Sequence, residues 1–508
     1  MIEESIEESP IERHDLYNFE SKIEYTYSKE KVNKKKPSYL IDTYFFIPKS
    51  LQINKETYSK EEFYSDLNNN IRFKTPKMSI EGILDKDNNL SPINVICAKI
   101  KEIEYGNISS EGHKKIQREL KLLGCIIKSS LRDQFSYFQN YFEQYKESVN
   151  SMESLRNYIK SIEKLQTKMD YLREKFAMAQ IPFDVRETFR YSDEYISYQI
   201  EAWLTSALKT FEKEFDVETQ KSIIKMITIE QSYRKSVDSR ISLKEGSDNE
   251  EFTYMESIMK KYLQSVLYLE KKKKDPKSSS LQMIYSIAAG LAMFLSLLLG
   301  LILLLFFNVN DIPYILGLVV IYMLKDRIKD IIHNSSQKAL GLFFPDARVD
   351  IIDGFFKEKI GVSKEKVLFL NWEKIPVEVL KIRESSNISP IEKEGKPEVC
   401  ILHKKKITLF RQRIDKHHTR QKDISDVIRF NITDFLKYAD DPVRPVLNWN
   451  ENKNQVELVP VSKFYHLNLI LKLTTFDKRK PSSVYFKKYR VILDQKGIRN
   501  VMEIKFTI

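Results

Sequence analysis

Hydrophobic residues recur every three or four positions from about residue 110 to residue 269, and this spacing is typical of amphipathic helices. Two apolar stripes are the clearest. The first comprises Ile116, Leu120, Leu123, Ile127, Leu131, Phe135, Phe138, Phe142 and Tyr145. The second comprises Leu155, Ile159, Ile162, Leu165, Met169, Leu172 and Phe176. We therefore predict a cytosolic helical bundle or a coiled-coil hairpin at residues 109–275.

The apolar stripes allow two interpretations. In the first, they are covered within the bundle and form its core. In the second, one stripe stays exposed and binds a protein partner or a second copy of the chain.

The first hundred residues mix strand and helix patterns. Residues 1–20 are acidic and poor in apolar residues, which predicts a disordered tail. Further on, the segments KIEYTYS and SYLIDTYFFIP are rich in aromatic and β-branched residues and are predicted strands. Ser59 and Glu62 have the spacing of a capping box, which predicts a short helix ending near Asp66. We expect a small α+β module at residues 21–108.

A β-rich domain is predicted for residues 365–508. Its candidate strands are KVLFLNW, EVCILHKKKITLFRQRI, QVELVPV and HLNLILKLTTF. Near the C-terminus, apolar and polar residues alternate on both sides of the segment Asp494-Gln495-Lys496-Gly497. Gly497 suits the positive φ of a tight turn, so this segment is predicted to join two strands as a hairpin.

The most apolar part of the chain is Met283 to Phe307, a run of 25 uncharged residues. At ~1.5 Å per residue such a helix is roughly 37 Å long and crosses the ~30 Å hydrocarbon core of a bilayer. A second apolar segment, Ile312 to Leu324, covers only ~20 Å. If the segment is taken to begin at Asn308, its length reaches the lower limit for a membrane-spanning helix. Lys325 and Arg327 could complete the span by extending their side chains to the headgroups.

We therefore expect a two-helix transmembrane hairpin at residues 281–324, with a re-entrant or interfacial second segment as the alternative. Ile328, Ile331 and Ile332 then line one side of the chain, which predicts an amphipathic exit helix at residues 325–345. The predicted fold class is an α+β membrane protein with a central membrane hairpin.

The charges beside the apolar segments predict on which side of the membrane the soluble regions lie. The membrane-flanking cations are Lys271, Lys272, Lys273, Lys274, Lys325 and Arg327. The turn between the two segments carries only Asp311. Because positive charge stays on the cytoplasmic side, we expect both large soluble regions to face the cytoplasm from a cytoplasmic (inner) membrane.

Overall composition adds two points. The chain has 83 basic and 71 acidic residues, a net charge of +12, which favours contact with an anionic lipid leaflet or with nucleic acid. Its cysteines, Cys97, Cys125 and Cys400, are far apart and odd in number, so reduced thiols in a reducing compartment are expected.

Basic residues are densest between positions 401 and 424. The candidate lipid- or phosphate-contacting residues are Lys404, Lys405, Lys406, Arg411, Arg413, Lys416, Arg420 and Lys422. The alternative is a solvated, positively charged hairpin tip near the membrane. His417 and His418 lie in this stretch, but adjacent strand residues point in opposite directions, so no metal site is expected.

No catalytic motif stands out. Glycine is scarce, at 13 of 508 residues, and neither GxxxxGK[ST] nor GxGxxG occurs, so no nucleotide-binding loop is expected. GxSxG and HExxH are also missing. We expect no cofactor and no catalytic residue, and an enzyme is the less favoured interpretation.

Three segments carry a resemblance to a known family. They are Phe45 to Pro76 (FFIPKSLQINKETYSKEEFYSDLNNNIRFKTP), Ile321 to Asp330 (IYMLKDRIKD) and the final KKYRVILDQKGIRNVMEI. They resemble an uncharacterised family of bacterial inner-membrane proteins with a central transmembrane hairpin. The resemblance extends along most of the chain and implies a bacterial inner-membrane location. The family has no established activity, so the resemblance implies no functional residue.

These observations lead to three functional hypotheses. The first is a non-enzymatic membrane-anchored scaffold or docking protein that presents helical and basic β-domains at the anionic cytoplasmic leaflet. The second is a membrane-tethered enzyme or signalling effector with an unrecognised site. The third is a membrane-anchored nucleic-acid binder that uses residues 404–422.

Overall fold

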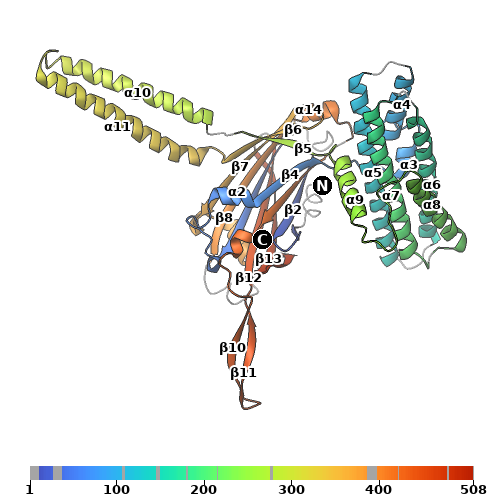
Figure 1. The fold of residues 1–508 in the computed structure, drawn as a ribbon. Coiled ribbons are helices and arrows are strands. Elements are labelled where there is room, and N and C mark those ends of the chain that lie inside the picture. The colour runs from blue at the N-terminus through green and yellow to red at the C-terminus, as the bar shows by residue number, and fades with distance from the viewer. Residues whose placement is uncertain are drawn as a thin grey trace.

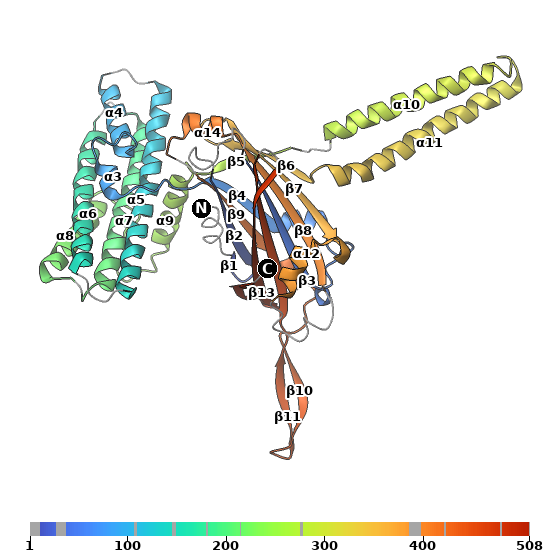
Figure 2. The same cartoon turned by 180° about the vertical axis from the view of Figure 1, so that it is seen from behind.

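The computed structural model describes residues 11–26, 37–105, 109–144, 149–178, 181–213, 215–274, 278–385, 398–420, 423–477 and 480–506. A central β-domain has a helical bundle on one side and a long helical hairpin on the other (Figure 1). A narrow β-hairpin points away from both, and the view from behind shows the same arrangement (Figure 2). The molecule is therefore α+β, as predicted.

The larger sheet of the β-domain has eight strands in antiparallel order. From edge to edge they are β14 (Gly497–Glu503), β13 (Lys480–Asp494), β12 (Tyr465–Asp477), β3 (Ser38–Pro48), β8 (Glu398–Leu409), β7 (Lys359–Leu370), β6 (Ala347–Asp353) and β5 (Leu269–Lys274). Within it, Phe46 of β3 lies opposite Cys400 on one side and Asn468 on the other. The sheet is thus built from segments at both ends of the chain.

A second sheet of four strands packs against the first. Its order is β1 (Ile11–Arg13), β2 (Asn18–Thr26), β9 (Asp423–Asn431) and β4 (Leu67–Phe73). At one edge, the Ile498 amide donates to the Leu16 carbonyl (2.7 Å). At the other, the Phe73 amide donates to the Leu267 carbonyl (2.8 Å). The two sheets are therefore joined at both edges.

This topology differs from the predicted domain organisation. The module expected at residues 21–108 and the β-rich domain expected at 365–508 share both sheets, because β2 and β4 pair with β9. The predicted disordered tail also ends earlier: Ile11 and Phe19 are buried, and β1 pairs with β2. Residues 1–10 of that tail lie outside the described residues.

Aromatic side chains fill part of the space between the sheets. Phe45, Phe63 and Phe430 are buried, and the centroid of the Phe430 ring lies 5.2 Å from those of the Phe45 and Phe63 rings. Burial of each ring contributes ~1.5–3 kcal/mol relative to exposure. Phe63 belongs to a helix that begins with the predicted capping box, in which Ser59 and Glu62 hydrogen-bond reciprocally.

Short helices connect the strands of the β-domain. They are η1 (Lys49–Leu51), α2 (Lys60–Asp66), η2 (Trp372–Lys374), α12 (Val377–Glu384), α14 (Arg411–His417) and η3 (Thr433–Leu436). The segment at α14 was predicted as part of a long strand, which instead ends at Leu409. The predicted C-terminal turn is confirmed, since Gly497 has φ +125° between β13 and β14.

The helical bundle is an insertion between β4 and β5. Its helices are α3 (Ile80–Leu84), α4 (Pro92–Glu104), α5 (Ser110–Gln144), α6 (Val149–Phe176), α7 (Phe183–Thr210), α8 (Val217–Ser236) and α9 (Glu250–Gln264). The second predicted stripe is buried from Leu155 to Phe176, and the first is buried at six positions from Ile116 to Phe138. These stripes therefore form the core of the bundle.

A second insertion separates the neighbouring strands β5 and β6. It consists of α10 (Ser278–Leu304) and α11 (Ile312–Phe343), which lie side by side as a hairpin (Figure 1). In the described part of the chain, one helical segment, Tyr285–Leu304, is long and apolar enough to cross a membrane. Only 11% of its most apolar window is buried within the protein. A second span in α11 stays a prediction.

Small residues mediate the contact between α10 and α11. Ala288 and Ala292 of α10 are buried, and Gly300 continues their spacing in multiples of four. A Cβ added at Gly300 would lie 3.8 Å from Leu318 of α11. Small side chains on this face therefore let the two backbones approach closely.

Candidate functional site

The predicted lipid- or phosphate-contacting residues do not share one surface. Lys405 is completely buried inside the β-domain. Arg411 is also buried, and its Nε lies 3.2 Å from Oδ2 of Asp415. Arg420 forms an ion pair with Glu119 of α5. These three cations have internal partners, so they are not available to an external phosphate.

The other members of the basic stretch are scattered. Lys406, Arg413 and Lys416 are exposed, and Lys404 is half-buried. Arg413 donates to the carbonyl of Lys359 (2.9 Å). Lys422 lies outside the described residues. A role for the exposed members at a lipid surface stays a prediction.

Lys405 belongs to an ionic cluster between the two sheets. Its Nζ lies 2.6 Å from Oδ2 of Asp426 and 3.9 Å from Oε1 of Glu365. His403 lies 3.3 Å from the same glutamate, and the Tyr25 hydroxyl donates to Asp426 (3.2 Å). Burial alone would raise the pKa of Glu365, but Lys405 and His403 lower it to about 2. The cluster is enclosed, so we assign it a structural role.

His417 and His418 have separate partners. The Arg118 guanidinium of α5 donates to Nδ1 of His418 (3.1 Å), so Nε2 carries the proton and donates to Asp353. His417 lies 3.1 Å from Glu358. In the described ranges, no group of three or more His, Cys, Asp or Glu residues could hold a metal ion. His418 instead joins the β-domain to the bundle.

The first four membrane-flanking cations lie in β5. Lys271 donates to the Asn69 carbonyl, and Nζ of Lys274 lies 3.1 Å from Asp350, whereas Lys272 and Lys273 are exposed. β5 is the last strand of the larger sheet, and exposed lysines on such a strand oppose the addition of a foreign strand.

The last two flanking cations lie on α11. Arg327 is exposed, whereas Lys325 is half-buried in the groove between the helices. Nζ of Lys325 lies 4.0 Å from the centroid of the Tyr322 ring. The Lys325 side chain therefore lies beside α10 and is only partly in contact with solvent.

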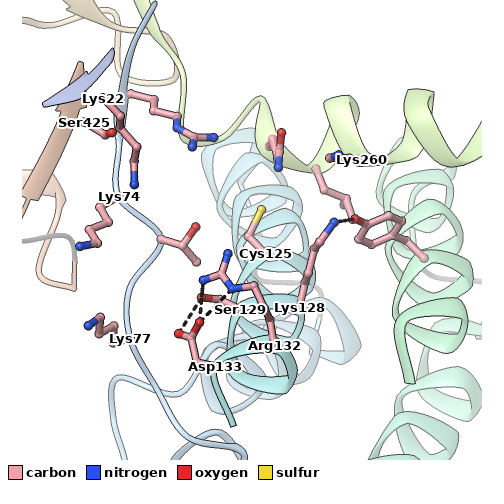
Figure 3. A pocket seen from close by; sticks show the side chains of 15 residues that line it. Lys22, Lys74, Lys77, Cys125, Lys128, Ser129, Arg132, Asp133, Lys260 and Ser425 are labelled. Carbon is pink, nitrogen blue, oxygen red and sulfur yellow. Dashed lines mark hydrogen bonds and ion pairs between the residues drawn. The ribbon is translucent and has the colours of Figure 1, made fainter. Parts of the chain in front are cut away.

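A basic cavity lies between the four-stranded sheet and the bundle (Figure 3). Residues alternate across each strand, so Ile71 and Phe73 of β4 point into the sheet core while Arg72 points toward the bundle. Lys22 of β2 and Ser425 of β9 point the same way. The outer face of this sheet thus supplies one wall of the cavity.

Helices supply the opposite wall. Cys125, Lys128, Ser129 and Arg132 have the spacing of one helix face on α5 and line the cavity together. Lys260 enters from α9. The innermost chamber has a volume of about 160 Å³. A wider cleft of about 730 Å³ shares part of the same wall and extends it outward.

Positive charge dominates the inner chamber. Its cations are Lys22, Arg72, Lys74, Lys77, Lys128, Arg132 and Lys260, and Asp133 is the only carboxylate among its lining residues. Burial, and then repulsion from Lys260, lowers the pKa of Lys128, although Glu256 acts in the opposite direction. Burial raises the pKa of Cys125 to about 12, so this thiol is protonated at neutral pH.

The sequence-based prediction did not include this cavity. The alternation around Arg72 is readable in the sequence, as is the spacing from Cys125 to Arg132. No pattern in the sequence near these segments, however, indicates that β4 faces α5 and α9. The charges of the basic stretch at 401–424 are close together in sequence, whereas the cavity collects charges from four separate segments.

The projecting hairpin is a second candidate site. Its strands are β10 (Val443–Asn450) and β11 (Gln455–Ser462). On one face, Leu447 pairs with Leu458 and Trp449 with Val456. These four side chains are between 54% and 71% exposed. No charged residue of β10 or β11 lies on that face. The other face carries Arg444, Asn448 and Glu457 and is more polar.

Comparisons of the chain with protein-family models, curated proteins and solved structures find no match.

Proposed function

We propose that the protein is a non-enzymatic docking protein that is anchored in the cytoplasmic membrane and binds a protein partner through the β10–β11 hairpin. The observation that carries the proposal is the apolar hairpin face formed by Leu447, Trp449, Val456 and Leu458, which projects from the β-domain (Figure 1). The apolar segment Tyr285–Leu304 supports the membrane anchor.

An isolated two-stranded hairpin is only marginally stable in water. Here it also exposes large apolar side chains, so a partner that covers them would stabilise it. Tryptophan is enriched among the residues that contribute most to protein interfaces, and Trp449 lies on this face at its end nearest the turn. An uncharged face that carries an exposed aromatic residue fits an apolar surface on a protein.

Prolines indicate that the partner covers the face and does not extend the sheet. Pro445 lies opposite Pro460, and neither can donate an amide hydrogen bond. This pair is therefore a non-hydrogen-bonded pair, and the missing amides fall on the two outer edges of the hairpin. Proline at an edge opposes the addition of another strand.

A second copy of this chain fits the face less well. Eight residues at ~3.4 Å each, on two strands ~4.8 Å apart, offer a face of roughly 270 Å². Two such faces would bury about 540 Å², against the ~1,200 Å² of a stable interface. A groove in another protein could cover the apolar face together with both edges and leave the polar face exposed, and we favour that arrangement.

Site-specific photocrosslinking tests the docking proposal. A photoreactive amino acid would replace Leu447 on the apolar face or, as the matched control, Asn448 on the polar face of the full-length protein in its native membrane. We expect one protein of defined mass to crosslink from position 447 and much more weakly from 448. Equal crosslinking from both positions, or crosslinking only to further copies of this chain, would reject the proposal.

The nucleic-acid hypothesis receives less support, because residues 404–422 are not gathered on one face and several have internal partners. The anionic inner leaflet stays part of the proposal as the surface beside the anchor.

A further inference from the structure

We propose that the basic cavity between the four-stranded sheet and the bundle binds a small anion with two or more phosphate groups. This ligand site is independent of the docking face and lies on another side of the β-domain (Figure 1).

The cavity has more positive charge than its own carboxylates can balance. Lys22 and Lys74 share Glu24, and Arg132 pairs with Asp133 (2.6 Å).

The remaining cations lack such partners. Among the described residues, Arg72, Lys77 and Lys260 take part in no ion pair, and Lys128 donates to the neutral Tyr195 hydroxyl (2.8 Å). Like charges brought together without counterions repel each other, so a bound anion would stabilise the arrangement.

A buried hydroxyl marks the same cavity. Ser425 is 1% exposed and lines the inner chamber, and its Oγ has no hydrogen-bond partner in the described part of the chain. Ser130 is 6% exposed, lines the outer cleft and also has an unpartnered Oγ. Buried polar groups normally have partners, and two donors in one cavity fit the oxygens of a ligand.

The volume of the chamber and the types of side chain that line it indicate the class of ligand. The inner chamber of about 160 Å³ has room for several water molecules and therefore for a phosphate or diphosphate group. Arginine binds phosphate oxygens in bidentate fashion and lysine binds them as a point charge. The four cations without a carboxylate partner exceed what a single carboxylate ligand would need. A chamber of this size between two walls also excludes a nucleic-acid duplex.

The outer cleft offers space for an organic group attached to the phosphates. It is lined by Met78 and by Tyr137, whose side chain is 58% exposed. An exposed tyrosine ring provides a flat surface on which a nucleobase stacks. A nucleotide is therefore one source of the phosphates, and inorganic pyrophosphate and an inositol phosphate headgroup are the others.

Titration calorimetry on the full-length, detergent-solubilised protein tests the proposal, with pyrophosphate, ATP and soluble inositol trisphosphate as probes. We expect saturable 1:1 binding of at least one probe, which weakens as salt is raised. Replacing the exposed cations of both walls, as K77M/K260M, should weaken binding about tenfold or more. The matched control K160M/K225M removes the same charge from α6 and α8 and should change binding less than about twofold.

The choice among probes identifies the source of the phosphates. If ATP binds more tightly than pyrophosphate and Y137A removes only that difference, the ligand is a nucleotide. If pyrophosphate or inositol trisphosphate binds best and Y137A has no effect, the phosphates alone are recognised. Absence of binding by all three probes at millimolar concentration would overturn the proposal. So would equal weakening by the K160M/K225M control.

Hydrogen exchange on the unmodified protein provides a test that needs no variant. The best-bound probe should slow amide exchange both in residues 72–77 and in residues 125–133, because the cavity is built from these two walls. Protection confined to one wall, or to neither, would contradict a ligand bound between them.

Discussion

Nζ of Lys405 lies 2.6 Å from Oδ2 of Asp426, and both side chains are 0% exposed between the two sheets. Such a pair contributes little net stability, but removing one partner leaves a buried, uncompensated charge. K405M should therefore lower the free energy of opening of β8 and β9, measured by hydrogen exchange, by ~3–5 kcal/mol.

The double variant K405M/D426N should recover a large part of that loss, because it removes the orphaned carboxylate as well. The exposed neighbour provides the control, and K406M should change stability by less than about 0.5 kcal/mol. If K405M and K406M behave alike, the ion pair is not formed as described.

Glu365 makes the stability of the β-domain depend on acid pH. Lys405 and His403 lower its pKa from 4.5 to about 2 despite burial, so the folded protein binds this proton less tightly than the unfolded chain does. The resulting stability is present above pH ~4.5 and is lost as pH falls toward about 2. E365Q should lose ~3 kcal/mol at pH 7, judged by urea titration, and that deficit should shrink at pH 3. A constant deficit at both pH values would contradict this assignment.

Gly317 is predicted to be essential for the close packing of α10 and α11. A Cβ at this position would lie only 2.5 Å from Cδ2 of Leu303, whereas a Cβ at Gly290 would have nothing within 4 Å. G317L should therefore abolish disulfide crosslinking between cysteines placed at Gly300 and Leu318 in membranes, and G290L should leave it intact. Loss of the crosslink in both variants would indicate a different register.

Reporter fusions test the expected membrane topology. A fusion at Asn310, in the turn between α10 and α11, should give an external signal if both helices cross the bilayer. A fusion at Ile508 should give a cytoplasmic signal, because the lysines before α10 favour retention on that side. An external signal at Ile508 would mean that α11 does not cross back.

Removing the hairpin of α10 and α11 should leave a water-soluble protein. Lys274 of β5 and Arg348 of β6 lie opposite each other in the sheet, so an Asn-Gly turn replacing residues 275–347 would join them as an ordinary β-hairpin. We expect this variant to be monodisperse in buffer without detergent by light scattering, and the full chain to require detergent. Aggregation of the shortened chain, or detergent-free monodispersity of the full chain, would contradict the anchor.

Local features were predictable from the sequence. The capping box at Ser59 and Glu62 and the turn at Gly497 each depend on neighbours within a few residues, and both are present in the structure. The helical stripes were predictable for the same reason, since residues three and four apart share a face.

Long-range pairing was not predictable. β3 is inserted between β8 and β12, and its alternation of residues is equally compatible with a local hairpin partner. The cavity depends on this topology, because Arg72 meets Lys128 and Lys260 only after the bundle has folded back onto β4. Charges that are adjacent in sequence, such as Lys404, Lys405 and Lys406, instead point to different sides of a strand.

The position of β5 has a mechanical consequence. This strand of six residues follows α9 of the bundle and precedes α10 of the long helical hairpin, and it is hydrogen-bonded to β6. Lateral tension on α10 would therefore load the β5–β6 ladder and reach the last helix of the bundle through a single short tether. If α10 crosses a bilayer, as we propose, a change in the thickness of that bilayer would act through this tether on α9, which supplies part of the wall of the basic cavity.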